Sequence, residues 1–257
     1  MKFFNQAVVA TSIFSSNILF WITTDYFHPN AELNPLLHNW SLSLEEQYYL
    51  FFPLILMFLW IKQRALILPV LLGLTVCSFS YGLWYASHEP SGAFYLLHTR
   101  AWELLIGAIA ARYYFESTIK SNDLLSLTGI CMIIGSILCI DKTVIFPSFY
   151  TLLPTIGTVL VICKTDQYSR IGRLLSTSVL VGLGLISYSA YLWHQPIFAF
   201  VRHRSLFEPS HSTFIWLILL SLALSYLSRN TLRHHLEIGI DSLGKRSLQL
   251  LCSSQGC

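Results

Sequence analysis

Charged residues are scarce in this sequence of 257 residues. Lys, Arg, Asp and Glu together make up 11% of the chain, whereas hydrophobic residue types make up 54%. A soluble globular domain carries about 25% charged residues, so this chain has too few charges to cover a water-facing surface of its size. Together with a mean hydropathy of +0.58, the composition excludes an ordinary soluble domain and indicates an integral membrane protein.

Two further absences narrow the function. The six cysteines contain no C-x-x-C pair, since four lie singly within apolar runs and two lie near the C-terminus; we therefore predict no metal site. The chain also has no stripe of Lys and Arg interleaved with aromatic residues, so nucleic acid is not expected as a partner.

Long apolar runs dominate what is present. A helix needs about 20 apolar residues, in a range of roughly 17 to 25, to cross the hydrocarbon core of a bilayer. The first run could be taken for a signal peptide, but it continues past Ile18 to Trp21 and no A-x-A cleavage site follows. The sequence predicts an all-α, polytopic transmembrane helix bundle of about eight spans: 7–24, 48–61 with the residues before it, 65–86, 94–114, 124–140, 150–163, 180–201 and 214–228.

The charges between these runs predict the orientation. Cytoplasmic loops of membrane proteins carry an excess of Lys and Arg, and here alternate loops hold most of the basic residues. The loop 202–211, which also carries Arg202 and Arg204, fits this alternation least well. We expect both termini in the cytoplasm, a transmembrane domain over residues 1–228 and a cytoplasmic tail over residues 229–257. The stretch around His38 then lies at the outer face.

That stretch, HNWSLSLEEQYYLFFP from His38 to Pro53, sets two adjacent carboxylates at the start of an apolar run. Ser43 and Glu46 have the spacing of a capping box, in which each side chain accepts a backbone N–H at the start of a helix. Glu46 therefore has either this structural role or a place in a site. Glu45 has no such local role.

Helical spacing divides the same stretch into two faces. One face is a candidate polar site, and the other has the aromatic character of an interfacial belt. The polar face comprises Ser41, Glu45 and Tyr49, and the belt face comprises Trp40, Leu44 and Tyr48.

Ionisable residues also occur inside the run 94–114, which contains His98, Arg100 and Glu103. Such groups cost about 2.5 to 3.5 kcal/mol each at membrane depth and usually mark function. The alternative is that Arg100 and Glu103, three residues apart on one helix face, neutralise each other.

The run 180–201 carries a second polar group. Tyr188, Tyr191 and His194 recur every three residues and form a slowly rotating stripe, with Ser187 and Gln195 nearby. The stripe either lines a cavity or holds a histidine whose hydrogen bonds are satisfied within the bundle.

Three ordered segments identify a family resemblance. HNWSLSLEEQYYLFFPLI resembles the H-x-W-S-L-x-x-E-E-Q-F-Y-L signature of the acyltransferase family 3 membrane O-acyltransferases. FYLLHTRAWELLIGAIAA resembles that family's R-x-W-E helix, and GLISYSAYLWHQPIFAF resembles its I-S-Y-S-L-Y-L-W-H helix. The flanking phrases ATSIFSSNILFW and DYFHPNAELNPLLHNW resemble the subgroup that modifies cell-surface polysaccharides. The resemblance covers residues 7 to about 233.

The resemblance implies transfer of an acyl group, usually acetyl, from acyl-CoA to a sugar hydroxyl of a cell-surface or lipid-linked glycan such as lipopolysaccharide. It implies a bacterial inner-membrane protein with no tightly bound cofactor, whose partners are membrane lipid, the glycan acceptor and the acyl-CoA donor.

A sugar hydroxyl is a weak nucleophile, so a histidine or carboxylate must take its proton during attack on the thioester, and an Arg or Tyr could stabilise the oxyanion. Carried over by motif, the catalytic residues are His38, Glu45 and Glu46, and the substrate-binding residues are Trp40, Ser41, Gln47, Arg100, Glu103, Ser187, Tyr188 and His194.

The sequence also departs from the family pattern. It begins where the family's third span would lie, so we expect it to lack the first two spans, the first-span histidine and a basic cytoplasmic loop. The C-terminal SGNH-type domain of many subgroup members is likewise expected to be absent. A catalytically inactive remnant or an interaction subunit is therefore an alternative. A transporter has less support, because no inverted repeat or broken helix pair is evident.

Overall fold

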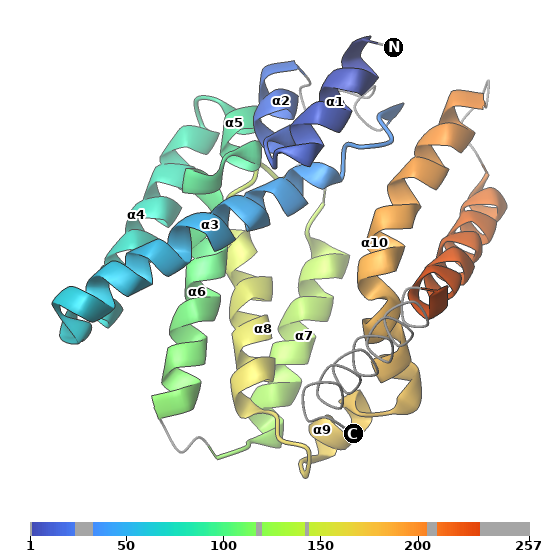
Figure 1. Ribbon diagram of the computed structural model, residues 1–257. Coiled ribbons are helices and arrows are strands. Elements are labelled where there is room, and N and C mark those ends of the chain that lie inside the picture. The colour runs from blue at the N-terminus through green and yellow to red at the C-terminus, as the bar shows by residue number, and fades with distance from the viewer. Residues whose placement is uncertain (1, 24–32, 117–119, 142–143, 205–209, 232–257) are drawn as a thin grey trace, which may run out of the picture. The chain divides into compact units, whose positions relative to one another are not determined.

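The computed structural model describes residues 2–23, 33–116, 120–141, 144–204 and 210–231 (Figure 1). Within these residues the chain forms helices and turns and no strand, which confirms the predicted all-α class. The chain divides into two compact units, Met1–Thr177 and Ser178–Cys257. The predicted tail lies almost entirely outside the described residues.

Three helices in the described part of the chain are long and apolar enough to cross a membrane: Asn39–Lys62, Arg64–Ala86 and His211–Thr231. The first of these is α3, and the second comprises a 3-10 turn and α4 (Ile67–Ala86). Two other apolar helices are shorter, α7 (Asp123–Cys139) and α8 (Leu152–Lys164). These lengths fit a helical membrane bundle, so the protein is an integral membrane protein.

Two more helices have the length of a span and carry the polar groups that the sequence singled out. They are α6 (Leu97–Glu116), of 20 residues, and α10 (Ser178–Arg204), of 27 residues. At about 1.5 Å per residue they extend about 30 and 40 Å. A short helix, α5 (Pro90–Tyr95), precedes α6, and another, α9 (Arg170–Leu175), closes the first unit.

The prediction of a single span over residues 7–24 is wrong. The structure has two short helices there, α1 (Lys2–Ser12) and α2 (Ser16–Thr23). The chain turns between them at Phe14, whose φ of 53° lies in the left-handed region that a non-glycine residue seldom adopts. The next residues are Ser15, Ser16 and Asn17, and the last two are buried and hydrogen-bonded to other helices of the first unit. These polar bonds stabilise the turn where an apolar run alone would favour a continuous helix.

Close approaches at glycine hold the helices of the first unit together. A Cβ on Gly129 of α7 would lie 2.6 Å from the carbonyl oxygen of Gly157 on α8, and a Cβ on Gly157 would lie 2.8 Å from that of Gly129. A Cβ on Gly82 of α4 would likewise lie 2.7 Å from the carbonyl oxygen of Thr99 on α6. Gly135, also on α7, takes no part in a close approach, because a Cβ built on it would have no atom within 4 Å.

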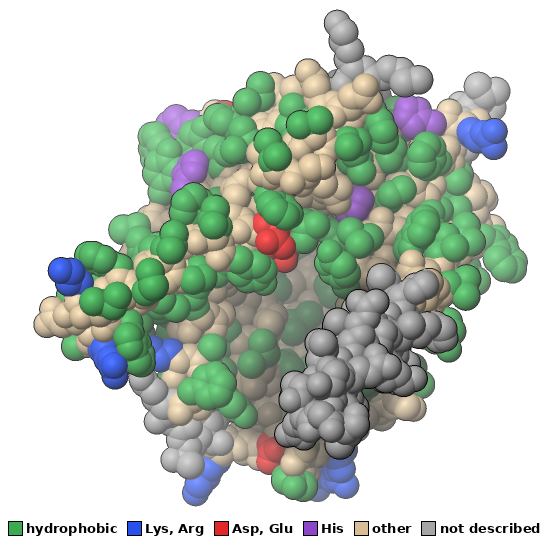
Figure 2. All heavy atoms as spheres, viewed as in Figure 1, with side chains coloured by type: hydrophobic (Ala, Val, Ile, Leu, Met, Phe, Trp, Pro, Cys, Tyr) green, Lys and Arg blue, Asp and Glu red, His purple; other side chains and the backbone are tan. Residues whose placement is uncertain are grey.

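Helices of the first unit alternate in direction, so that α3, α6 and α8 run one way while α4 and α7 run the other (Figure 1). Basic residues at the ends of α3 and α8, Lys62 and Lys164, therefore lie at one end, and His38 and His88 lie at the other. Over α3 and α4 the outer face is largely hydrophobic (Figure 2). This arrangement fits the alternation of loop charges, and the side of the membrane that each end faces stays a prediction.

Candidate functional site

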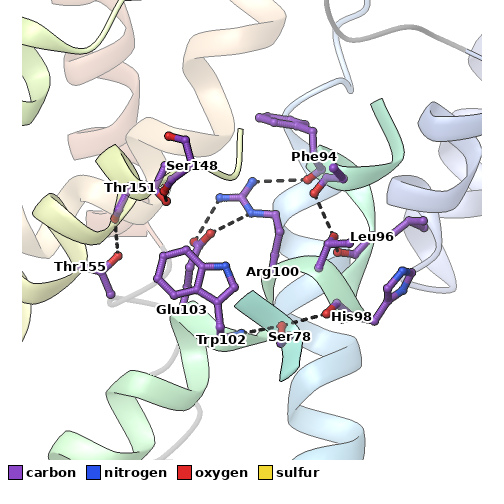
Figure 3. Close-up of polar contacts among 12 residues, drawn as sticks. Ser78, Phe94, Leu96, His98, Arg100, Trp102, Glu103, Ser148, Thr151 and Thr155 are labelled. Atoms are coloured by element: carbon purple, nitrogen blue, oxygen red, sulfur yellow. Dashed lines mark hydrogen bonds and ion pairs between the residues drawn. The ribbon is translucent and has the colours of Figure 1, made fainter. Parts of the chain in front are cut away.

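The centre of the candidate site is an ion pair on α6. The Arg100 Nε lies 3.1 Å from the Glu103 Oε1, and its Nη2 lies 3.1 Å from the Oε2 (Figure 3). The two side chains are only 14% and 29% exposed. A two-pronged bond of this kind fixes the plane of the guanidinium as well as its position. The ion pair that the sequence allowed between Arg100 and Glu103 is therefore present, and other side chains of the first unit surround it.

Aromatic rings surround the guanidinium. Its Cζ lies 5.0 Å from the ring centroid of Trp40 on α3, 5.2 Å from that of Phe94 on α5, and 4.3 Å from that of Phe146, which precedes α8. The Nη1 also donates to the carbonyl oxygen of Phe94 at 3.5 Å. Rings at these distances attract the cation by about 0.5 to 2 kcal/mol each, depending on how far the group is desolvated. Arg100 is thus held from four segments of the first unit.

Hydrogen bonds join the first turn of α6 to neighbouring segments, and they fix the position of the Arg100 backbone. The Ser78 hydroxyl on α4 donates to the carbonyl of His98 at 2.8 Å and accepts from the backbone N–H of Trp102 at 3.1 Å. The Thr99 hydroxyl lies 2.9 Å from the carbonyl of Ala93 and 2.7 Å from that of Leu96. Trp102 and Thr99 are both fully buried, so this turn belongs to the rigid core.

Trp40 joins the first sequence motif to this ion pair. Its ring packs on Phe94 at 4.5 Å and on Tyr95 at 5.7 Å between centroids. Leu44, one turn along α3, is 6% exposed, and Tyr48 stacks on Phe52. Of the face that the sequence assigned to an interfacial belt, Trp40 therefore packs on the rings of α5 and the Arg100 guanidinium of α6, and Leu44 is buried within the first unit. The position of this face relative to the membrane interface stays a prediction.

The predicted capping box is wrong. Helix α3 begins at Asn39, four residues before Ser43, so Ser43 and Glu46 lie within the helix. The Ser43 hydroxyl instead accepts from the backbone N–H of Ser16 at 3.3 Å and lies 2.7 Å from its hydroxyl. Ser43 thus satisfies a donor at the start of α2, and Glu46 loses the structural role that its spacing suggested.

Gln47 is bonded across to the turn before α2. Its Nε2 donates to the Oδ1 of Asn17 at 2.9 Å and to the carbonyl of Phe14 at 2.8 Å. The Nδ2 of Asn17 in turn lies 3.4 Å from the Gln47 Oε1 and donates to the carbonyl of Tyr95 at 3.2 Å. These bonds give Gln47 a structural role, and contact with substrate stays a prediction for it.

The two carboxylates of the first motif, Glu45 and Glu46, differ from Glu103 in that neither is paired with a cation among the described residues. Glu45 is exposed and Glu46 is half-buried, and neither forms a hydrogen bond or ion pair with a residue that the structure describes. His38 is 8% exposed, and the Ser41 hydroxyl donates to its backbone carbonyl at 3.4 Å. Their catalytic and binding roles stay predictions.

The third motif lies in the second unit, on α10. Tyr188 is 61% exposed, and the Ser187 hydroxyl donates to the carbonyl of Gly184 at 2.7 Å. The Nδ1 of His194 lies 2.6 Å from the carbonyl of Tyr191, whose ring is 5.5 Å from the imidazole. The predicted stripe is therefore present on this helix, and its part in a binding site stays a prediction.

Sequence reasoning missed several residues of the site. Phe146 and Ser78 contact the Arg100 segment from distant parts of the chain, and no local pattern marks them. A cavity of about 510 Å³ extends from Glu103 between α6 and α8. Small and hydroxyl-bearing residues line much of it, among them Gly107, Ala110, Ala111, Thr151, Thr155 and Thr158.

These features define a class: a helical integral-membrane protein with a half-buried ion pair that is surrounded by aromatic rings and lies beside a cavity of about 510 Å³. The chain matches the family model described as an acyltransferase domain over residues 3–229. It therefore belongs to acyltransferase family 3, as the three sequence motifs indicated.

Curated relatives agree with this assignment. The peptidoglycan O-acetyltransferase OatA of Listeria monocytogenes is 29% identical over 85% of this chain, which spans 37% of that protein. YrhL of Bacillus subtilis is 30% identical over 86% of this chain, again 37% of the relative. An uncharacterized protein of Haemophilus influenzae is 33% identical over 60% of this chain and 68% of its own length. The chain thus spans little more than a third of the named enzymes, and no solved structure matches it.

Proposed function

We propose that this chain is a membrane O-acyltransferase that transfers an acetyl group from acetyl-CoA to a hydroxyl of a cell-surface polysaccharide. The observation that carries the proposal is the meeting of two family motifs at one place: the ring of Trp40 from the first motif lies 5.0 Å from the Arg100 guanidinium of the second, which is paired with Glu103. The family match and the named O-acetyltransferases among the relatives support the same reaction.

The reaction needs a base, a hydrogen-bond donor that stabilises the oxyanion, and a leaving group. The hydroxyl oxygen of the sugar attacks the thioester carbonyl carbon, the carbon–sulfur bond breaks, and the proton passes from the hydroxyl to a protein base and then to the departing thiolate. We assign the base to Glu45, which is exposed and has no competing partner among the described residues, with His38 and Glu46 beside it in the motif. The Arg100 guanidinium, held in one plane by Glu103, has N–H groups beyond those that bond Glu103 and Phe94, and we assign these as hydrogen-bond donors to the oxyanion.

The relatives and the motifs support the proposed acceptor and membrane. Peptidoglycan, the acceptor in the name of the Listeria relative, and lipopolysaccharide are both polymers of hydroxyl-rich sugars on a bacterial surface. We place the protein in the bacterial plasma membrane, where acetyl-CoA is available on one side and the glycan on the other.

Deletion and re-expression in the native host test this function. Loss of the gene should lower the acetyl content of surface polysaccharide, as measured by NMR of purified glycan, and the full chain supplied in trans should restore it. Unchanged acetyl content in the deletion strain would contradict the proposal and favour an inactive remnant or an interaction subunit.

A further inference from the structure

A second cavity of the first unit is separate from the Arg100 site. It is a groove of about 760 Å³ between α3, α4 and α6. Its walls are Phe51, Phe52 and Ile55 of α3 with Leu74, Cys77 and Tyr81 of α4, and Ala101 and Leu105 of α6 form part of its floor. His98, which also lines it, points away from the Arg100–Glu103 pair (Figure 3).

The groove opens onto the hydrocarbon-facing surface. Phe51, Ile55 and Leu74 on its walls are 54%, 38% and 39% exposed. They continue into the apolar outer faces of α3 and α4, two of the helices long and apolar enough to span a membrane. A hollow in such a surface is filled by lipid chains, because the atoms lining an empty one would forfeit dispersion contacts.

One end of the groove is polar. The imidazole of His98 lies 5.3 Å from the Tyr81 ring and 6.3 Å from the Tyr85 ring between centroids. It forms no hydrogen bond with any residue that the structure describes, and it is exposed. The imidazole lies in the first turn of α6, at the end of the helix where lipid headgroups are expected, and there it can donate a hydrogen bond to a phosphate or ester oxygen.

We propose that this groove binds one phospholipid of the surrounding bilayer, with a hydrocarbon chain along α6 and the ester or phosphate oxygens of its headgroup at His98. From Leu97 to Leu105 the groove follows α6 for about 12 Å, which fits a segment of one chain. His98 lies near the same end of α6 as Arg100, so the bound lipid belongs to the leaflet on that side. The inference does not rest on the proposed acyl transfer.

A matched pair of substitutions on α4 tests the chain-binding part. Cys77→Trp places a large ring in the groove, whereas Val76→Trp places the same ring on the adjacent residue, which is 62% exposed and does not line it. Both positions are exposed, so neither change disturbs the buried core. The full chain is purified in detergent, and retained phospholipid is counted by native mass spectrometry. Cross-links from a phospholipid with a diazirine in its acyl chain are mapped by peptide sequencing.

Wild-type protein and Val76→Trp should retain one phospholipid and cross-link mainly within residues 51–55 and 97–105, and Cys77→Trp should lose both signals. His98→Phe keeps an aromatic ring but removes the hydrogen bond, and it should weaken retention about fivefold, the factor that one hydrogen bond of about 1 kcal/mol contributes. Cross-links spread evenly over the apolar faces of α3 and α4, or groove cross-links that persist in Cys77→Trp, would overturn the proposal. Equal retention by His98→Phe and wild type would overturn the headgroup contact.

Discussion

Arg100 shows how much of this site depends on the shape of one side chain. Its guanidinium makes a two-pronged bond to Glu103 and contacts three aromatic rings. A lysine keeps the charge, but its ammonium is a compact, strongly hydrated point charge that cannot form the fork or stack as a plane. The geometry around Arg100 therefore selects a guanidinium.

We accordingly predict that Arg100→Lys lowers acetyl transfer about 100-fold, as expected when one fixed donor to a developing oxyanion is lost, while the protein still accumulates in the membrane. Arg64→Lys is the matched control, because Arg64 also lies over an aromatic ring, that of Trp60, at 3.8 Å and at the opposite end of α3. Transfer rates per amount of membrane protein check this. Equal losses in the two variants would show that stacking in general, and not this site, matters.

The two adjacent carboxylates give a second comparison. Because Glu45 has no partner among the described residues, Glu45→Gln should leave thermal unfolding unchanged while it abolishes most acetyl transfer. Glu46→Gln should also leave stability unchanged, since the capping role inferred from its spacing is not present. Both variants are compared with wild type by thermal unfolding in detergent and by acetyl transfer. A Glu45→Gln protein with wild-type transfer would remove this residue from the mechanism.

At the scale of helices, periodicity and composition predicted most elements but could not predict their contacts. The runs 65–86, 124–140 and 180–201 correspond closely to α4, α7 and α10. The run 7–24 does not, because its interruption depends on hydrogen bonds from Ser43 and Gln47, which lie about 30 residues away in sequence. The contacts of Trp40 could not be predicted for the same reason: the rings and the charge that it packs on come from α5 and α6. The local sequence pattern cannot predict contacts with residues that are distant in the chain.

The close contact between α7 and α8 predicts that a larger side chain at Gly129 lowers the stability of the protein. Gly129→Val adds a side chain whose Cβ meets a backbone carbonyl at 2.6 Å, so the two helices must separate. We expect a loss of about 1 to 3 kcal/mol, the usual cost of overpacking, seen as a lower unfolding temperature in detergent. Gly135→Val on the same helix meets nothing within 4 Å and serves as the control. Similar unfolding temperatures for both variants would contradict the close packing.

For the whole molecule, the three motifs identified the family, and the structure brings two of them together in one unit. The first two motifs meet through Trp40 and Arg100 in the first unit, and the third lies on α10 of the second unit. The sequence anticipated Arg100 and Glu103 as a pair because their spacing is local. It could not anticipate Phe146 or Ser78, since cation–ring and hydroxyl contacts of this kind depend on tertiary packing alone.

The most direct test of the account is transfer of radiolabelled acetyl from acetyl-CoA to surface polysaccharide in membrane vesicles that contain the full chain. Vesicles with wild-type protein should label the polysaccharide, and vesicles with equal amounts of the Arg100→Lys protein should label it only weakly. Equal labelling by the two proteins would contradict the site, and labelling no greater than in vesicles without the chain would contradict the function.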